Sequence, residues 1–163
     1  MFGSLNLCSR YASLYHKVVA SCPQDKTNVI QNVTVEENIK ICKPYAICKE
    51  LPNLDEYIDY LLDMLKLKPL LKSKYSNIAG GMQRRLSLLL SLIRIPQILL
   101  LDEITANVDP LLKHDIWDVL NDFQKRFNRS IIMTSHDSYE LQYVCSHIVH
   151  IDAGNIVVDA KVE

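Results

Sequence analysis

Short, continuous apolar runs recur along the chain and predict strands that are buried in a parallel sheet. The runs are "KVVAS" at residues 17–21, "QILLL" at 97–101 and "SIIMTS" at 130–135. Runs of this kind, with no polar alternation, are typical of strands covered on both faces. Further along, "HIVHIDAGNIVVDA" at 147–160 places two apolar runs around an Ala-Gly turn, which predicts an antiparallel hairpin.

Helical patterns lie between the first two of these runs. Thr34 with Glu37, and Asn53 with Glu56, match the capping pattern that starts a helix. After the second pair, apolar residues recur at the spacing of one helix face: Ile58, Leu61, Leu62 and Leu65. Residues from about 34 to 75 therefore predict a helical insert between strands.

The rest of the chain alternates between helix and strand. A helix is predicted from Gly80 to about Arg94, where a proline follows. Another follows Pro110, and Asp137 and Glu140 are expected to cap a third. One face of the helix after Pro110 is apolar: Leu112, Ile116, Leu120, Phe123 and Phe127. This alternation predicts an α/β fold with a largely parallel sheet and an antiparallel edge.

Composition narrows the classes of protein without naming one. The chain has 163 residues, of which 48% are hydrophobic and 23% charged, so it fits one globular domain. The net charge is −1 and the Lys and Arg residues are scattered, so the sequence predicts no basic patch for nucleic acid or an anionic membrane surface. Five dispersed cysteines indicate reduced thiols. No apolar stretch reaches the roughly 18 residues of a membrane helix, so we expect the chain itself to be soluble.

Polar side chains follow each predicted parallel strand. Gln24 follows the first strand, Asp102 and Glu103 the second, and His136 the third. Ligands bind at the carboxyl ends of the strands in such sheets. Asp102 suits a Mg²⁺ shell, with Gln24 in its outer part, and Glu103 could accept a proton from an attacking water. The alternative is two solvated acids that cap the next loop and a structural histidine.

Gly80 and Gly81 stand just before a predicted helix start. A helix start has free N–H groups, and glycine lets a phosphate approach that backbone closely. Arg84 and Arg85 are expected to add positive charge nearby. The alternative is that the two glycines only form a turn.

The order of these motifs resembles the nucleotide-binding domain of ATP-binding cassette (ABC) transporters over nearly the whole chain. "SCPQD" resembles the Q-loop, "NVTVEENI" the start of the helical subdomain, "IAGGMQRRLSL" the signature motif, "ILLLDEITANVDP" the Walker B strand and D-loop, and "IIMTSHD" the switch-histidine strand. The resemblance gives these roles: Glu103 and His136 catalytic; Gln24, Ala79, Gly80, Gly81 and Asp109 nucleotide-binding; Asp102 and Gln24 on the metal.

The resemblance implies a P-loop-NTPase-like parallel core with a helical insert and a C-terminal hairpin. Core strands and the Q-loop would occupy residues 1–33, the helical subdomain 34–79, and the signature helix, Walker B, D-loop and switch-histidine core 80–163. In the family, two such domains sandwich two ATP molecules with Mg²⁺. Each site takes its signature and D-loop from the partner domain.

The implied function is ATP hydrolysis that powers transport through membrane domains. The chain would be held at the cytoplasmic side of a membrane by its parent transporter, and nucleic acid is not an expected partner. The wording "GGM", "CPQ" and "TVEENI" resembles the A subfamily of lipid exporters.

Three departures from the family pattern qualify this expectation. The only glycines are Gly3, Gly80, Gly81 and Gly154, so no G-x-x-x-x-G-K-[ST] phosphate loop exists in the chain. We therefore expect an N-terminally truncated cassette that is inactive alone, from a parent that is an ATPase. Ala79 replaces the usual signature serine. Ile104 and Asn107 replace a usual Pro and Gly, although Asn tolerates positive φ.

Two alternatives follow from these departures. The chain could be a non-catalytic interaction module that docks on a complete partner domain and offers it the signature face. A soluble ABC ATPase that acts on the ribosome or DNA is disfavoured by the neutral charge and the A-type wording.

Overall fold

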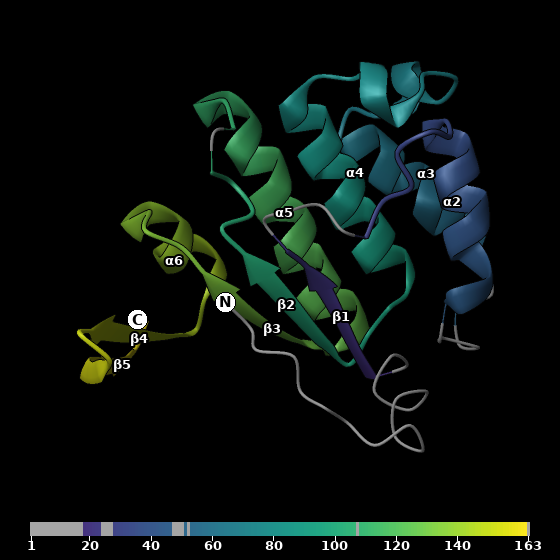
Figure 1. Cartoon of the computed structure of the whole chain (residues 1–163). Helices are drawn as coiled ribbons and strands as arrows, with labels where there is room; N and C mark the ends of the chain where they lie inside the picture. The colour runs from purple at the N-terminus through teal and green to yellow at the C-terminus, as the bar shows by residue number, and fades with distance from the viewer. Residues whose placement is uncertain (1–17, 24–27, 47–50, 52, 107, 163) are drawn as a thin grey trace, which may run out of the picture.

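The computed structural model describes residues 18–23, 28–46, 51, 53–106 and 108–162 (Figure 1). Its strands are β1 (Val19–Cys22), β2 (Ile98–Asp102), β3 (Ser130–Thr134), β4 (His147–Asp152) and β5 (Asn155–Lys161). Its α-helices are α2 (Val35–Cys42), α3 (Leu54–Met64), α4 (Gly80–Ile93), α5 (Pro110–Phe127) and α6 (Ser138–Val144). Three short 3₁₀ turns are η1 (Lys43–Tyr45), η2 (Lys68–Leu70) and η3 (Tyr75–Asn77).

The first three strands form a parallel sheet in the order β1-β2-β3. Val19 pairs with Ile98, and Ile98 in turn pairs with Ser130, so all three carboxyl ends lie at one edge. β4 and β5 form a separate antiparallel pair. The predicted α/β class, with a parallel core and an antiparallel hairpin, is confirmed.

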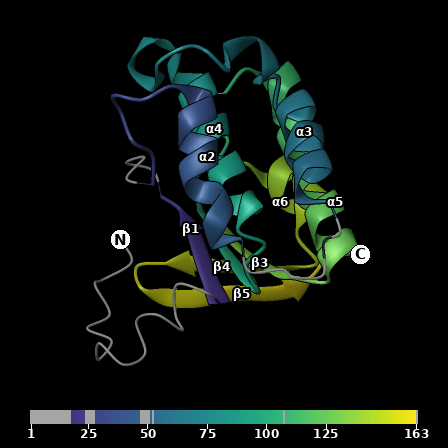
Figure 2. The same cartoon turned by 90° about the vertical axis from the view of Figure 1, so that its right-hand side faces the viewer.

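Helix α4 is the centre of the apolar core. It packs against β1 on one side and against α2 and α3 on the other, and Figure 2 shows those two helices as an outer layer. Six of its apolar side chains are buried: Leu86, Leu88, Leu89, Leu90, Leu92 and Ile93. α3 presents its predicted face to the same core, with Ile58, Leu61, Leu62 and Leu65 all buried. The helical insert and the sheet therefore share one core.

The start of α2 carries the capping box that the sequence predicts. The Glu37 amide donates to Thr34 Oγ1 at 3.2 Å, and the Thr34 amide donates to Glu37 Oε2 at 2.7 Å. The bond from the Thr34 amide, together with one from the Thr34 hydroxyl to the same Glu37 oxygen at 3.0 Å, lowers the pKa of the Glu37 carboxyl. At α3 only one bond of the predicted capping pair forms. The Asn53 side chain accepts from the Glu56 amide at 3.4 Å and caps the helix alone.

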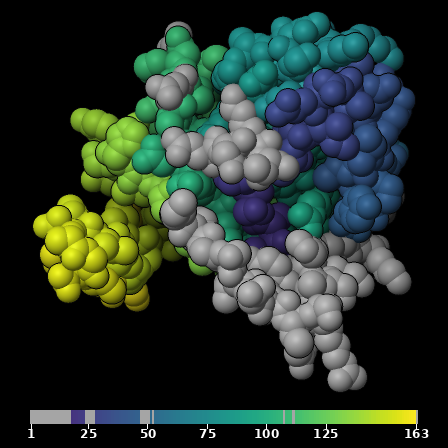
Figure 3. All heavy atoms as spheres, viewed as in Figure 1, coloured from purple at the N-terminus to yellow at the C-terminus, as the bar shows by residue number. Residues whose placement is uncertain are grey.

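The predicted burial of β3 is wrong. Its residues are exposed or half-exposed, and the Ile132 side chain is 54% exposed. Among the described strands only β2 pairs with β3, so its other edge faces a hollow of about 650 Å³ beside β4. Apolar side chains line this hollow from both sides: Ile131, Ile132, Met133, Ile148, Val149 and Ile151. Figure 3 shows the hairpin at one side of the molecule.

Two further findings concern the cysteine thiols and the possibility of membrane-spanning helices. Cys22, Cys42 and Cys145 are free thiols, and burial raises the pKa of each; Cys8 and Cys48 lie outside the described residues. None of the described helices is long and apolar enough to cross a membrane.

The capping box at α2 gives a stability prediction. Thr34→Ala removes the hydroxyl that accepts from the Glu37 amide, so the free energy of unfolding should fall by about 1 kcal/mol. Urea denaturation followed by circular dichroism measures this change. Thr34→Ser is the matched control, since it keeps the hydroxyl. An equal loss in both variants would contradict the capping role.

Candidate functional site

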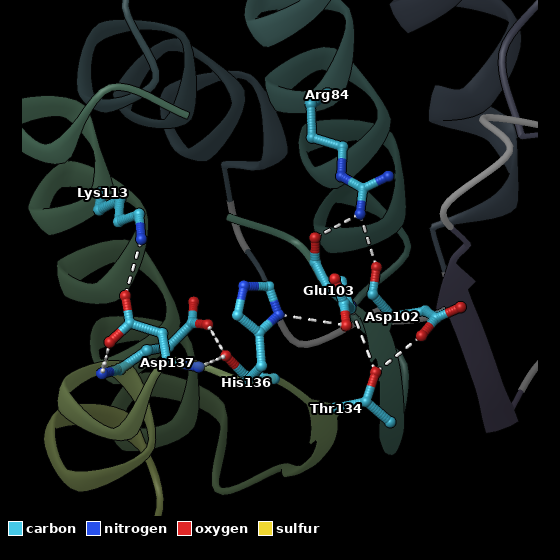
Figure 4. A network of polar contacts seen from close by, with 9 residues as sticks. Arg84, Asp102, Glu103, Lys113, Thr134, His136 and Asp137 are labelled. Carbon is cyan, nitrogen blue, oxygen red and sulfur yellow. Dashed lines mark hydrogen bonds and ion pairs between the residues drawn. The ribbon is translucent and has the colours of Figure 1, made fainter. Parts of the chain in front are cut away.

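The structure brings three of the predicted site residues together at the carboxyl edge of the sheet (Figure 4). Asp102 ends β2 and Glu103 follows it, while His136 lies two positions after β3. His136 Nδ1 lies 3.3 Å from Glu103 Oε1. The His136 side chain is 77% exposed and the Glu103 side chain 35%, so both are open to solvent. Parallel register places them here, because β2 and β3 end side by side.

Thr134 links the two acidic residues to β3. Its hydroxyl donates to Asp102 Oδ1 at 2.7 Å, and its carbonyl accepts from the Glu103 amide at 3.1 Å. The second oxygen of Asp102 points away from Thr134 in Figure 4. One oriented carboxylate fits a Mg²⁺ ion that arrives with phosphate oxygens and keeps its waters. It does not fit a metal held by protein alone, since no cluster of three or more His, Cys, Asp or Glu occurs among the described residues.

Glu103 has a left-handed backbone, with φ of 46°. Its carbonyl accepts from the Ala106 amide at 3.0 Å, which closes a tight turn. Ile104 lies within this turn, and its side chain is fully buried in the core. An apolar side chain at position 104 therefore anchors the turn, and this explains a departure that sequence reasoning left without a cause.

The expectation that Arg84 and Arg85 place charge at the start of α4 is wrong. Both side chains are buried and point into the molecule. Arg84 donates to the carbonyls of Asp102, Glu103 and Ile104, as Figure 4 shows in part. Arg84 thus spends its donors on backbone carbonyls at the end of β2 and does not turn its charge toward the start of α4.

Arg85 turns to the helical layer. Its Nη1 donates to the Leu65 carbonyl and its Nη2 to the Leu112 carbonyl, both at 3.0 Å. Burial lowers the pKa of Arg85, and Asp115 at 3.8 Å partly opposes that effect. Arg85 therefore joins α3 to α5 rather than serving a ligand.

The buried carboxyl group of Glu140 holds the loop that carries His136. Glu140 was expected to help cap the helix that follows this loop. Glu140 accepts from Trp117 Nε1 at 3.0 Å and from Ser135 Oγ at 2.5 Å, and it is fully buried. The Asp137 amide donates to Ser135 Oγ at 3.0 Å. Asp137 alone caps α6. Sequence spacing gives no signal for Glu140, because its partner Trp117 is on another helix.

Asp137 also pairs with Lys113 of α5. Lys113 Nζ lies 2.7 Å from Asp137 Oδ2, and this bond lowers the pKa of the Asp137 carboxyl. A cavity of about 80 Å³ lies between these residues and Glu103 and His136. That volume holds about two or three waters.

The predicted signature residues Ala79, Gly80 and Gly81 lie at the N-terminal end of α4. Ala79 is the N-cap, makes no side-chain capping bond and is exposed, as is Gly80. A Cβ added at Gly81 would meet no atom of the described chain within 4 Å. Within the described ranges, no hydrogen bond or ion pair joins these three residues to Glu103 or His136. The chain's own packing therefore does not require glycine at position 81.

The remaining predicted residues are only partly placed. Gln24 and Asn107 lie outside the described residues. Asp109 is exposed before α5, and its carbonyl accepts from the amides of Leu112 and Lys113. The structure thus places Asp109 at a helix start and leaves its proposed contact with a nucleotide as a prediction.

Comparisons with known proteins agree on one family. The family model described as "ABC transporter" matches residues 5–106. The chain is 31% identical over 134 residues to the Nod factor export ATP-binding protein I of Rhizobium meliloti, covering 82% of this chain and 39% of that protein. It is 35% identical over 153 residues to ABC transporter G family member 23 of Dictyostelium discoideum, covering 92% and 21%. The chain therefore spans less than half of these relatives.

Solved structures support the fold. The dimeric, post-hydrolysis structure of the ATP-binding cassette MJ0796 with ADP and Pi matches with a TM-score of 0.81. The match covers 97% of this chain and 69% of that chain, at 17% sequence identity. At that identity the likeness shows the fold alone.

The Lys113–Asp137 pair gives a pH-dependent prediction. The folded pKa of Asp137 is depressed, so its contribution is present above the unfolded pKa of about 3.9 and is lost as the pH falls through the folded value. Asp137→Asn keeps a capping oxygen and removes the charge. At pH 7 it should lower the free energy of unfolding by up to about 1 kcal/mol.

At pH 3 the same substitution should cost less, because the stability from the ionised carboxyl declines once the pH falls below the unfolded pKa. Urea denaturation at both pH values measures the difference, and Lys113→Met should show the same trend. A cost for Asp137→Asn that does not depend on pH would contradict the ion-pair account.

Proposed function

Because this chain belongs to the ABC transporter family, we propose that it supplies the catalytic strand, signature and switch-histidine segments of an ATPase that powers transport across a membrane. One observation carries the proposal: Glu103 and His136 come from neighbouring parallel strands and lie 3.3 Å apart, beside Asp102. A carboxylate next to an imidazole can accept a proton from water and orient the water for attack.

Each residue has a distinct proposed role. Glu103 is the general base for the attacking water, and His136 contacts the terminal phosphate. Asp102 takes part in the shell of Mg²⁺, which arrives with ATP and neutralises phosphate charge when bound. Gln24 is proposed to orient water or complete that shell. Asp109 is proposed to act across a dimer interface.

The start of α4 is proposed to serve the nucleotide of a partner domain. Ala79 ends the proposed helical subdomain, residues 34–79, and Gly80 and Gly81 begin the signature helix that follows it. Gly81 has open space around it, so a phosphate of a second domain could approach its amide. The partners are therefore proposed to be a second nucleotide-binding domain and the transporter's membrane domains.

A lipid is the proposed cargo class. The motif wording "GGM", "CPQ" and "TVEENI" supports it through its resemblance to the A subfamily. One relative carries a G family name, so the subfamily stays a prediction.

A second candidate is a non-catalytic module that offers its signature face to a complete partner. It is favoured by the absence of any G-x-x-x-x-G-K-[ST] stretch in the 163 residues, since that loop supplies the amides and lysine that hold the phosphates. A fusion protein separates the two functions: a P-loop-bearing segment of a relative is joined in front of the chain. Hydrolysis of Mg-ATP by this fusion supports the first function, and binding without hydrolysis supports the second.

In that fusion, Glu103→Gln should slow hydrolysis by about 10²–10⁴-fold, the range for loss of a general base. ATP affinity, measured by calorimetry, should survive because the amide keeps the size of the side chain. Asp102→Asn is the companion variant and should instead weaken Mg²⁺-dependent binding. Unchanged turnover in both variants would refute the catalytic assignment.

The glycine pair gives a separate prediction on the same fusion. Gly81→Asp places a carboxylate where amides should face a partner's phosphate, and such repulsion costs several kcal/mol, so ATP-dependent dimerisation should be lost. ATP affinity of the single domain should change little. Ala79→Ser is the control: it restores a hydroxyl, can also cap α4, and should leave dimerisation intact or improved. Normal dimerisation of Gly81→Asp, measured by light scattering, would show that the glycines only form a turn.

A further inference from the structure

The Arg84 side chain of α4 donates hydrogen bonds to the backbone at the end of β2 and just beyond it. Arg84 lies one helical turn into α4, and its side chain is buried. Nη2 donates to the carbonyls of Asp102 at 2.6 Å and Glu103 at 2.5 Å, and Nε donates to the Ile104 carbonyl at 3.3 Å. One side chain thus binds three consecutive carbonyls.

Those carbonyls lie at a turn with a left-handed residue, Glu103. Glu103 has a positive φ, a conformation that residues with a side chain rarely adopt and that surrounding bonds must enforce. On one side of its Cα, Thr134 accepts from the Glu103 amide. On the other side, Arg84 and the Ala106 amide donate to the Glu103 carbonyl. Both peptide groups of Glu103 are therefore fixed.

We propose that Arg84 is a positioning residue for hydrolysis: it holds the left-handed backbone of Glu103 and thereby aims that carboxylate at His136 and the adjoining cavity. This inference rests on the function proposed above and adds a residue to it. Arg84 does not contact the substrate. It acts through Glu103.

Only arginine satisfies this geometry. The guanidinium is a flat fork whose nitrogens can donate to several carbonyls at once, whereas a lysine ammonium is a single point on a flexible stem. Methionine fills a similar volume and donates nothing, so it would remove the side-chain donor from all three carbonyls and leave the Glu103 carbonyl only its bond from the Ala106 amide. Arg84→Met should therefore release the turn, and Arg84→Lys should restore it in part.

Hydrogen exchange on the 163-residue chain tests the backbone role without ATP. Arg84→Met should speed exchange of the Glu103 and Ala106 amides by roughly tenfold or more, as expected for losing bonds from a charged donor. Arg85→Met is the matched control, because it also removes a buried guanidinium. The Arg85 side chain donates to the carbonyls of Leu65 and Leu112 and not to the Glu103 turn. Equal exchange at Glu103 in the two variants would overturn the proposal.

Turnover in the fusion protein tests the catalytic consequence. Arg84→Met should lower kcat by roughly 10²-fold, the effect of a small misplacement of a reacting group, and leave the Kd for ATP unchanged. Arg84→Lys should recover part of that loss. In a Glu103→Gln background, Arg84→Met should add little, because the residue through which it acts is already disabled.

The outcomes separate this inference from the proposed function. A wild-type fusion that does not hydrolyse ATP refutes the proposed function, and the exchange experiment then decides the backbone role alone. In an active fusion, a normal kcat for Arg84→Met would overturn the positioning role. So would a double variant in which the separate kcat losses of Arg84→Met and Glu103→Gln multiply in full.

Discussion

The described fold depends on two buried guanidinium groups that leave α4 in different directions. Arg84 binds the backbone at the end of β2, and Arg85 binds one carbonyl of α3's C-cap and one of α5. A buried cation is costly unless it donates hydrogen bonds. The backbone segments that accept from Arg84 and Arg85 therefore cannot move away without a large loss of folding free energy. The outer helices, the sheet edge and α4 are thereby held in one arrangement. Leucines of α4 fill the space between them.

The chemistry at the sheet edge follows from that arrangement. Parallel register brings the ends of β2 and β3 together, yet register alone would not aim the side chains. Thr134 holds Asp102 through its hydroxyl and Glu103 through its carbonyl. Glu140, bonded to Trp117 and Ser135, holds the loop of His136. Thr134, which holds both acids, is itself exposed, whereas Glu140 beneath the His136 loop is buried. Hydrogen bonds to each group give this solvent-exposed site a defined geometry.

Local patterns predicted what local physics controls. The capping box at Thr34, the apolar face of α3 and the hairpin were all readable, because each depends on residues close in sequence. The direction of Arg84 and the role of Glu140 were not, since their partners lie 18 to 23 positions away on other elements. Ile104 gave no signal either, because its burial depends on the turn at Glu103. The burial of β3 failed for another reason: an apolar run shows that a strand can be covered, but not what covers it.

The open edge of β3 has a consequence for the behaviour of many copies together. Its backbone groups pair with no described strand on that side, and Ile132 stands exposed beside the hollow. A free edge of this kind is a template on which an extended segment of another molecule can add a strand. Such addition depends on concentration, whereas the packing of α4 does not. If a segment of another molecule occupied that edge of the described sheet, the extent of pairing would be set by how much protein is present.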